Sequence, residues 1–114
     1  MAYSQIAEID PLRSLAFGSI SGTYAAVGIA FTHPVRVICI TNNTDGDMVF
    51  SNDGITDKLF LAKGSFKLFD LNTNHDGGLN QGLKIRVGTV MYVKQVSAPT
   101  TGSVYIENIY AFGD

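Results

Sequence analysis

Short apolar runs rich in β-branched residues alternate with polar turn clusters along nearly the whole chain. Clusters such as 42–46 and 52–54 consist of Asn, Asp, Thr and Gly, which end strands because they adopt positive φ or imitate turn backbone with their side chains. No run has the length and period of a stable helix. Strands that recur about every ten residues predict an antiparallel sandwich or barrel.

The segment 35–41 is the clearest strand, and it is apolar on both faces except at Arg36. Such a strand is expected to be central in its sheet or to lie beneath a partner. The segment 103–112 alternates cleanly and is expected to be the final strand. Further strands are predicted at 12–20, 48–51, 83–87 and 89–96.

Two predictions concern local geometry. The segment 24–31 is expected to be one strand that places Val27, Ile29 and Phe31, with Ala25, on a single face. The segments 56–62 and 65–71 are expected to form a hairpin around Lys63-Gly64.

The sequence therefore predicts an all-β fold: a single antiparallel β-sandwich, jelly-roll-like, with about eight strands. Residues 12–114 form the sandwich domain. Residues 1–11 are expected to be an N-terminal arm or a loosely attached first strand. Pro11 belongs at a strand start or an edge, since it has no N–H to donate to a ladder.

Composition narrows the possible functions. The 114 residues suit one domain, and only 16% of them are charged, which suggests that a partner covers part of the surface. The net charge is −2 and the basic residues are dispersed, so nucleic-acid binding is not expected. No apolar stretch approaches the roughly 20 residues of a membrane span, and no secretory signal begins the chain. A soluble protein made in the cytoplasm, with no membrane partner, is expected.

Candidate chemistry is sparse. The segment 72–77 resembles the start of a calcium loop, but it begins with Asn72 and has Leu83 where a bidentate Glu is required. Neither His33 nor His75 has neighbours with zinc-site spacing. Cys39 is the only cysteine and lies within a strand, as a small buried hydrophobe would. No enzyme, cofactor or metal is predicted.

Aromatic and apolar residues provide the candidate contacts. Alternation places Tyr105, Glu107 and Ile109 on one face of the last strand, opposite Val104 and Ile106. Outward tyrosines are common at protein interfaces. The predicted partner-binding residues are those of the arm and of this face: Tyr3, Ile6, Ile9, Tyr105 and Ile109.

A resemblance to a known group accompanies these residues. The order of Phe31-Thr32-His33-Pro34-Val35, Val49-Phe50-Ser51-Asn52-Asp53-Gly54 and Gly102-Ser103-Val104-Tyr105 is similar to that of short all-β virion structural proteins of tailed bacteriophages. In size and sandwich character the chain also resembles capsid decoration proteins of the cement or staple type.

The resemblance implies a non-enzymatic virion protein that binds the major capsid protein, or another virion protein, and stabilises the assembled lattice as a homo-oligomer. Two alternatives remain open. One is a head–tail connector or tail component that forms a ring. The other is a carbohydrate-binding module, for which the absence of Trp is unfavourable.

Overall fold

The computed structural model describes residues 5–71 and 85–113, and in them the chain is almost entirely β-structure. A single 3-10 turn, η1 (Phe17–Ser19), interrupts the strands of this described part. The strands are β1 (Gln5–Ile9), β2 (Arg13–Ala16), β3 (Ala25–Ala26), β4 (Val35–Thr44), β5 (Met48–Ser51), β6 (Leu59–Leu61), β7 (Ser65–Asp70), β8 (Tyr92–Gln95) and β9 (Gly102–Gly113).

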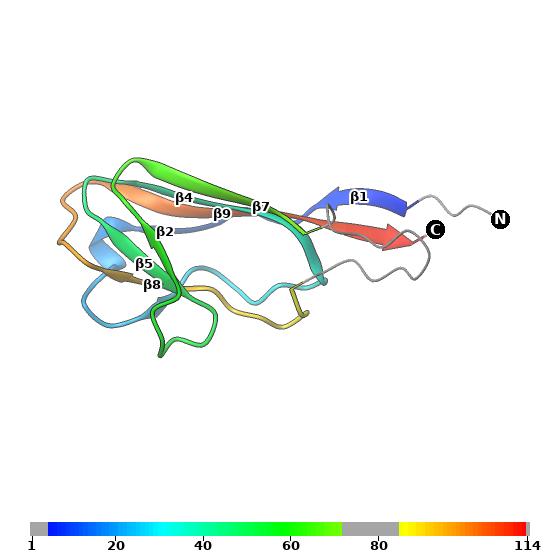
Figure 1. Ribbon diagram of the computed structural model, residues 1–114, viewed down its shortest axis with the longest axis horizontal. Coiled ribbons are helices and arrows are strands. Elements are labelled where there is room, and N and C mark those ends of the chain that lie inside the picture. Colours follow the sequence, from blue (N-terminus) through cyan, green and yellow to red (C-terminus); the bar gives the residue numbers. More distant parts are fainter. Residues whose placement is uncertain (1–4, 72–84, 114) are drawn as a thin grey trace.

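These strands form two antiparallel sheets (Figure 1). One sheet has the order β1-β9-β4-β7, with β2 also paired to β9, and the other has the order β3-β8-β5-β6. From β2 onward the pairs are nested: β2 with β9, β3 with β8, β4 with β7 and β5 with β6. The further pairs β4·β9 and β5·β8 wrap this long hairpin into two layers, which is the jelly-roll arrangement.

The predicted antiparallel sandwich of jelly-roll type is therefore confirmed, with β1 as an additional strand. β1 continues along β9 past the end of β2, so that the start of β1 and the end of β9 lie at the same end of the molecule (Figure 1). β1 and β2 lie at the edge of the sheet, and Pro11 between them needs no ladder partner there.

The core lies between the two sheets and is built from the inward positions of their strands. In β9 the inward residues Val104 and Ile106 are fully buried, as the alternation predicted. In β4 the inward residues are Val35, Ile38 and Ile40. The opposite sheet contributes chiefly Met48, Phe50, Leu61 and Val93.

Two irregularities lie on either side of β9 at nearly the same level. In β4 the pairing shifts between Val35 and Val37, so that Arg36 is an extra residue relative to β9. On the other side of β9, Ile9 pairs with Ile109 and Arg13 pairs with Ile106. The chain advances four residues from Ile9 to Arg13 while β9 covers only three, so the N-terminal edge also holds one extra residue. An extra residue reverses the side of the sheet on which the following residues point. Strand 35–41 is central, as predicted, but Val35 shares the inner face with Ile38 rather than the face of Val37.

The single strand predicted at 24–31 is wrong. Only Ala25–Ala26 is a strand, and Gly28 takes a φ of 72° that breaks the alternation. Val27 and Phe31 remain buried, but Ile29 is 63% exposed. Its carbonyl is turned inward instead, where it accepts a hydrogen bond from Arg13.

The predicted hairpin around Lys63-Gly64 is also wrong. β6 pairs with β5 in one sheet, whereas β7 pairs with β4 in the other, so 62–64 is a corner between the layers. Gly64 has a φ of 70°, and the Ser65 amide donates to the Ala62 carbonyl across the turn. A turn signal marks where a strand stops but not which sheet the next strand joins.

Other predicted strands are shorter than expected. Only Arg13–Ala16 of 12–20 and Tyr92–Gln95 of 89–96 are strands, while Ile85 forms an isolated bridge with Val35. The calcium-like segment 72–77, with His75, lies outside the described residues. The turn at 42–46 begins later than predicted, because β4 extends to Thr44.

A substitution of Gly102, at the start of β9, tests how closely β9 packs against β4. Gly102 has a φ of 92°, and a Cβ there would clash with the carbonyl oxygen of Asn43. We expect Gly102→Ala to lower the free energy of unfolding by about 1–3 kcal/mol. Gly22→Ala has open space around it and should change this free energy by less than about 0.5 kcal/mol. Chemical denaturation measures both, and equal effects of the two variants would contradict the prediction.

Candidate functional site: the outer face of the β1-β9-β4-β7 sheet

The side of this sheet that faces away from the core carries three cross-strand rows of side chains. The first row is Ile9, Ile109, Val37 and Asp70; the second is Glu107, Cys39 and Leu68; the third is Ser14, Tyr105, Thr41 and Phe66. We call these rows the outer apolar face, because most of their members are apolar or aromatic. Directly paired side chains in adjacent strands lie within contact distance of one another.

Several large apolar side chains of this face are open to solvent. Ile9 is 77% exposed, Phe66 is 65% exposed and Leu68 is 59% exposed. Between them, Ile9, Val37, Cys39, Leu68 and Ile109 line a shallow hollow of about 210 Å³, with Glu107 and Asn108 also on its wall. Grouped exposed apolar side chains mark interaction surfaces more often than isolated ones do.

The structure brings together three of the five predicted contact residues. Ile9 and Ile109 are direct partners in the ladder, and Tyr105 lies on the same face of β9. Ile6 is in β1, where its backbone pairs with Phe112, but its side chain is not described. Tyr3 lies outside the described residues.

Sequence reasoning missed the contributions of β4 and β7 to this face, namely Val37, Cys39, Phe66 and Leu68. The signal for Val37 and Cys39 was the strand that is apolar on both faces, which predicted either burial or a partner. Cys39 is half-buried rather than buried, and its thiol lies beside the Thr41 hydroxyl. Nothing in the local pattern of 65–70 showed that Phe66 and Leu68 would align with Tyr105 and Glu107.

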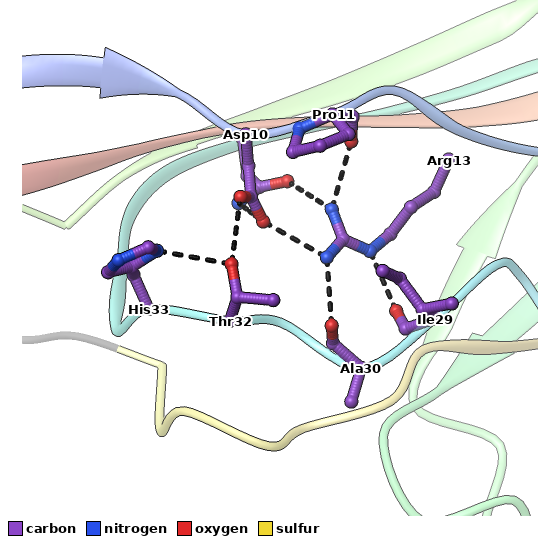
Figure 2. A network of polar contacts seen from close by, with 8 residues as sticks. Asp10, Pro11, Arg13, Ile29, Ala30, Thr32 and His33 are labelled. Atoms are coloured by element: carbon purple, nitrogen blue, oxygen red, sulfur yellow. Dashed lines mark hydrogen bonds and ion pairs between the residues drawn. The ribbon is translucent and has the colours of Figure 1, made fainter.

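A buried polar junction is centred on Asp10 and Arg13, which follow Ile9 in the chain (Figure 2). Arg13 and Asp10 form an ion pair at 3.0 Å, and the two side chains are only 2% and 3% exposed. The guanidinium also donates to the carbonyls of Pro11, Ile29 and Ala30 at 3.0, 2.7 and 2.9 Å and to the side-chain oxygen of Asn108 at 3.2 Å. All five of its N–H groups are thereby used. Its cationic carbon lies 4.8 Å from the centre of the Phe31 ring.

Asp10 is equally well partnered. Its carboxylate accepts hydrogen bonds from Thr32 and Asn108 at 3.1 and 3.2 Å, besides the contact with Arg13. Burial alone raises the pKa of the Asp10 carboxyl, but these hydrogen bonds and the Arg13 charge outweigh it and hold the pKa below its usual value.

The same network extends to His33. The Thr32 hydroxyl has one hydrogen, which it gives to the Asp10 carboxylate, so the contact with His33 Nδ1 at 3.1 Å requires Nδ1 to donate. The His33 ring is stacked on Tyr110 of β9, with ring centres 3.8 Å apart. The junction thus connects the edge strands, the 29–33 loop and β9.

The acidic residues in the loops have structural roles that the geometry explains. Asp53 accepts hydrogen bonds from the amides of Ile55 and Thr56 and from the Ser51 hydroxyl, which lower the pKa of its carboxyl. Asp45 similarly accepts from the Thr100 amide and hydroxyl. These carboxylates stabilise turns within the clusters predicted at 42–46 and 52–54.

Asp57 has a different set of partners. It accepts a hydrogen bond from Tyr24 at 2.5 Å and pairs with Lys94 at 3.0 Å. Burial, together with the Asp57 carboxylate, raises the pKa of the Tyr24 phenol. Lys94 also lies over the Tyr24 ring, at 4.8 Å from its centre, so this group links β8 to the 52–58 loop.

Within the described ranges, no three His, Cys, Asp or Glu side chains are grouped so that they could hold a metal ion. The same part of the chain contains no helix of the length and apolarity that crossing a membrane requires.

Comparison with known proteins supports the fold. No protein-family model matches the chain, and no curated protein matches it. Among solved structures, a similar chain occurs in the cyanophage Pam1 capsid asymmetric unit. The alignment covers 98% of this chain and 89% of that chain, with a TM-score of 0.50 and 14% sequence identity. At this identity the likeness shows a shared fold.

Replacing Asp10 tests the polar junction. We expect Asp10→Asn to lower the free energy of unfolding by about 3–5 kcal/mol at pH 7, because it leaves the buried Arg13 charge uncompensated. The folded-state pKa of Asp10 is lowered, so its ionic stabilisation is complete above the unfolded value of about 3.9 and is lost as pH falls through the folded value. The difference between wild type and variant should therefore shrink in acid.

Denaturant titrations between pH 3 and pH 7 measure this difference. Glu8→Gln is the control, since Glu8 is exposed on β1, and it should change the free energy of unfolding by less than about 0.5 kcal/mol. A difference between wild type and Asp10→Asn that stays the same across this pH range would contradict the assigned role of the ionised carboxylate.

Proposed function

We propose that this protein is a non-enzymatic structural component of a bacteriophage virion, and specifically a decoration protein that binds the assembled major capsid lattice. The observation that carries the proposal is the jelly-roll fold shared over 98% of the chain with a chain of the cyanophage Pam1 capsid asymmetric unit. Jelly rolls are a recurrent architecture of viral capsid domains. The resemblance of its motifs to short virion proteins of tailed phages points in the same direction.

The outer apolar face supplies a surface for such a role. It lies on a sheet held rigid by long ladders, and it presents exposed apolar side chains without a catalytic group among its described members. A protein that binds the assembled lattice but not the free subunits stabilises the lattice by mass action. Stabilisation then needs only binding energy, and no chemical step.

The first test is the copy number of the protein in purified particles of the phage that encodes it, by quantitative mass spectrometry against the major capsid protein. We expect a ratio commensurate with the icosahedral lattice, because decoration repeats with the lattice. A count that matches one ring would instead indicate a connector or tail component. Absence of the protein from particles would overturn the virion assignment itself.

The N-terminal arm is a second, separable part of the proposal. Asp10 is buried in the polar junction, so a truncation that tests the arm must end before it. Deletion of residues 2–9 removes β1 and the exposed Ile9 side chain but leaves Asp10 and Arg13 in place. We expect the truncated protein to fold and to bind particles more weakly than the full chain.

Thermal unfolding and co-sedimentation with particles measure the two effects. Ile55→Ser is the control for loss of an exposed apolar side chain, since Ile55 lies in the loop after β5 and is 82% exposed. Undiminished particle binding by a folded truncated protein would show that the arm is not a contact.

A further inference from the structure

The charge pattern of the outer apolar face indicates what kind of surface covers it. Glu107 lies in the middle of the three rows, where it pairs with Cys39, and the other two rows lie on either side of it along β9. The Glu107 residue is exposed. The other charged residue of the three rows, Asp70, is also an acid. No lysine or arginine belongs to these rows, all of whose members are described. The face is therefore apolar with a negative charge near its centre.

This charge disfavours a second copy of the chain as the occupant. A two-fold contact places the same patch on both partners, so a contact centred on this face would bring one Glu107 towards the other. Like charges brought together in a desolvated interface cost free energy. A partner that carries a positive charge removes this cost and gains a charge-assisted hydrogen bond.

The hollow lined in part by Glu107 limits the shape of the partner side chain that can fill it. Its lining combines the apolar residues Ile9, Val37, Leu68 and Ile109 with Glu107, the charged residue among those that line it. A lysine or arginine fits both features, because its alkyl stem covers apolar surface while its charged end reaches the carboxylate. Arginine is also among the residues that most often dominate binding energy at interfaces.

We propose that the outer apolar face docks on the surface of the major capsid protein, and that a lysine or arginine of that surface enters the hollow and pairs with Glu107. The inference rests on the proposed function for the identity of the partner. The choice of the outer apolar face as the docking surface, and of a positive charge on the partner, is argued from the structure of this chain alone.

Cys39 offers a direct test without any mutation. It is the only cysteine of the chain, it is half-buried, and it lies on the wall of the hollow. Capsid shells assembled without this protein are mixed with it, and the rate of Cys39 alkylation by a small maleimide is compared in free and shell-bound protein. We expect alkylation to be at least about tenfold slower in the bound protein, because a docked partner excludes the reagent.

The charge is tested by a matched pair of variants. Glu107→Lys is compared with a control that changes the net charge by the same amount on the opposite sheet, in the loop between β5 and β6, where Ile55 and Thr56 are exposed. We expect Glu107→Lys to weaken shell binding by at least about tenfold and Glu107→Gln to weaken it less, since a reversed charge repels the partner's cation. The double variant Ile55→Lys/Thr56→Lys carries the same change in net charge and should bind as the wild type does. Thermal unfolding verifies that each variant is folded.

The outcomes separate the inference from the proposed function. Binding of wild-type protein to shells with unchanged Cys39 alkylation would overturn the docking face and leave the virion assignment standing. Equal binding by Glu107→Lys and by Ile55→Lys/Thr56→Lys would overturn the basic anchor. Cys39 protection that rises with the concentration of free protein would show that a second copy covers the face. Failure of the wild-type protein to bind shells would overturn both proposals.

Discussion

The buried ion pair between Asp10 and Arg13 is the contact on which the arrangement of the edge strands depends. Two charges that are removed from water require close partners, and here every N–H of the guanidinium finds an acceptor. The pair can form only because the chain holds one extra residue between Ile9 and Arg13 relative to β9. That residue reverses the alternation, so Arg13 points into the junction while Ile9 points outward. The exposed position of Ile9 on the outer apolar face is thus a consequence of satisfying a buried charge.

The nested pairing of the jelly roll explains why this face is built mainly from segments distant in sequence. β1 and β2, from the N-terminal part of the chain, pair with one side of β9. β4 pairs with the other side of β9, because the long hairpin folds over into two layers. The irregularity at Arg36 then turns Val37 to the same side as Ile109. Two irregularities, one on each flank of β9, therefore align Ile9, Ile109 and Val37 in a single row. A regular ladder would have turned at least one of them inward.

The residues of the outer apolar face could be predicted where their position depends only on the sequence pattern of their own strand. Tyr105 and Ile109 followed from the strict alternation of β9, and Ile9 from an apolar arm that ends at Asp10-Pro11. Phe66 and Leu68 could not be predicted, because their role requires the register between β7 and β4. Ile29 was misplaced for a related reason. Gly28 packs against Arg13 with a positive φ, and this distant contact interrupts the alternation of its segment.

The sequence by itself determined the class of fold, the positions of most turns and the inward residues of the longest strands. These features depend on period-two alternation and on the backbone preferences of Gly, Asn, Asp and Pro, which act over a few residues. The tertiary structure alone decided that 62–64 is a corner between sheets, that Val35 and Val37 face opposite ways, and that three rows meet on one outer face. Each of these depends on which strand lies alongside and in which register. That choice is made by burying the core and pairing the Arg13 charge, and both require contacts between residues far apart in the chain.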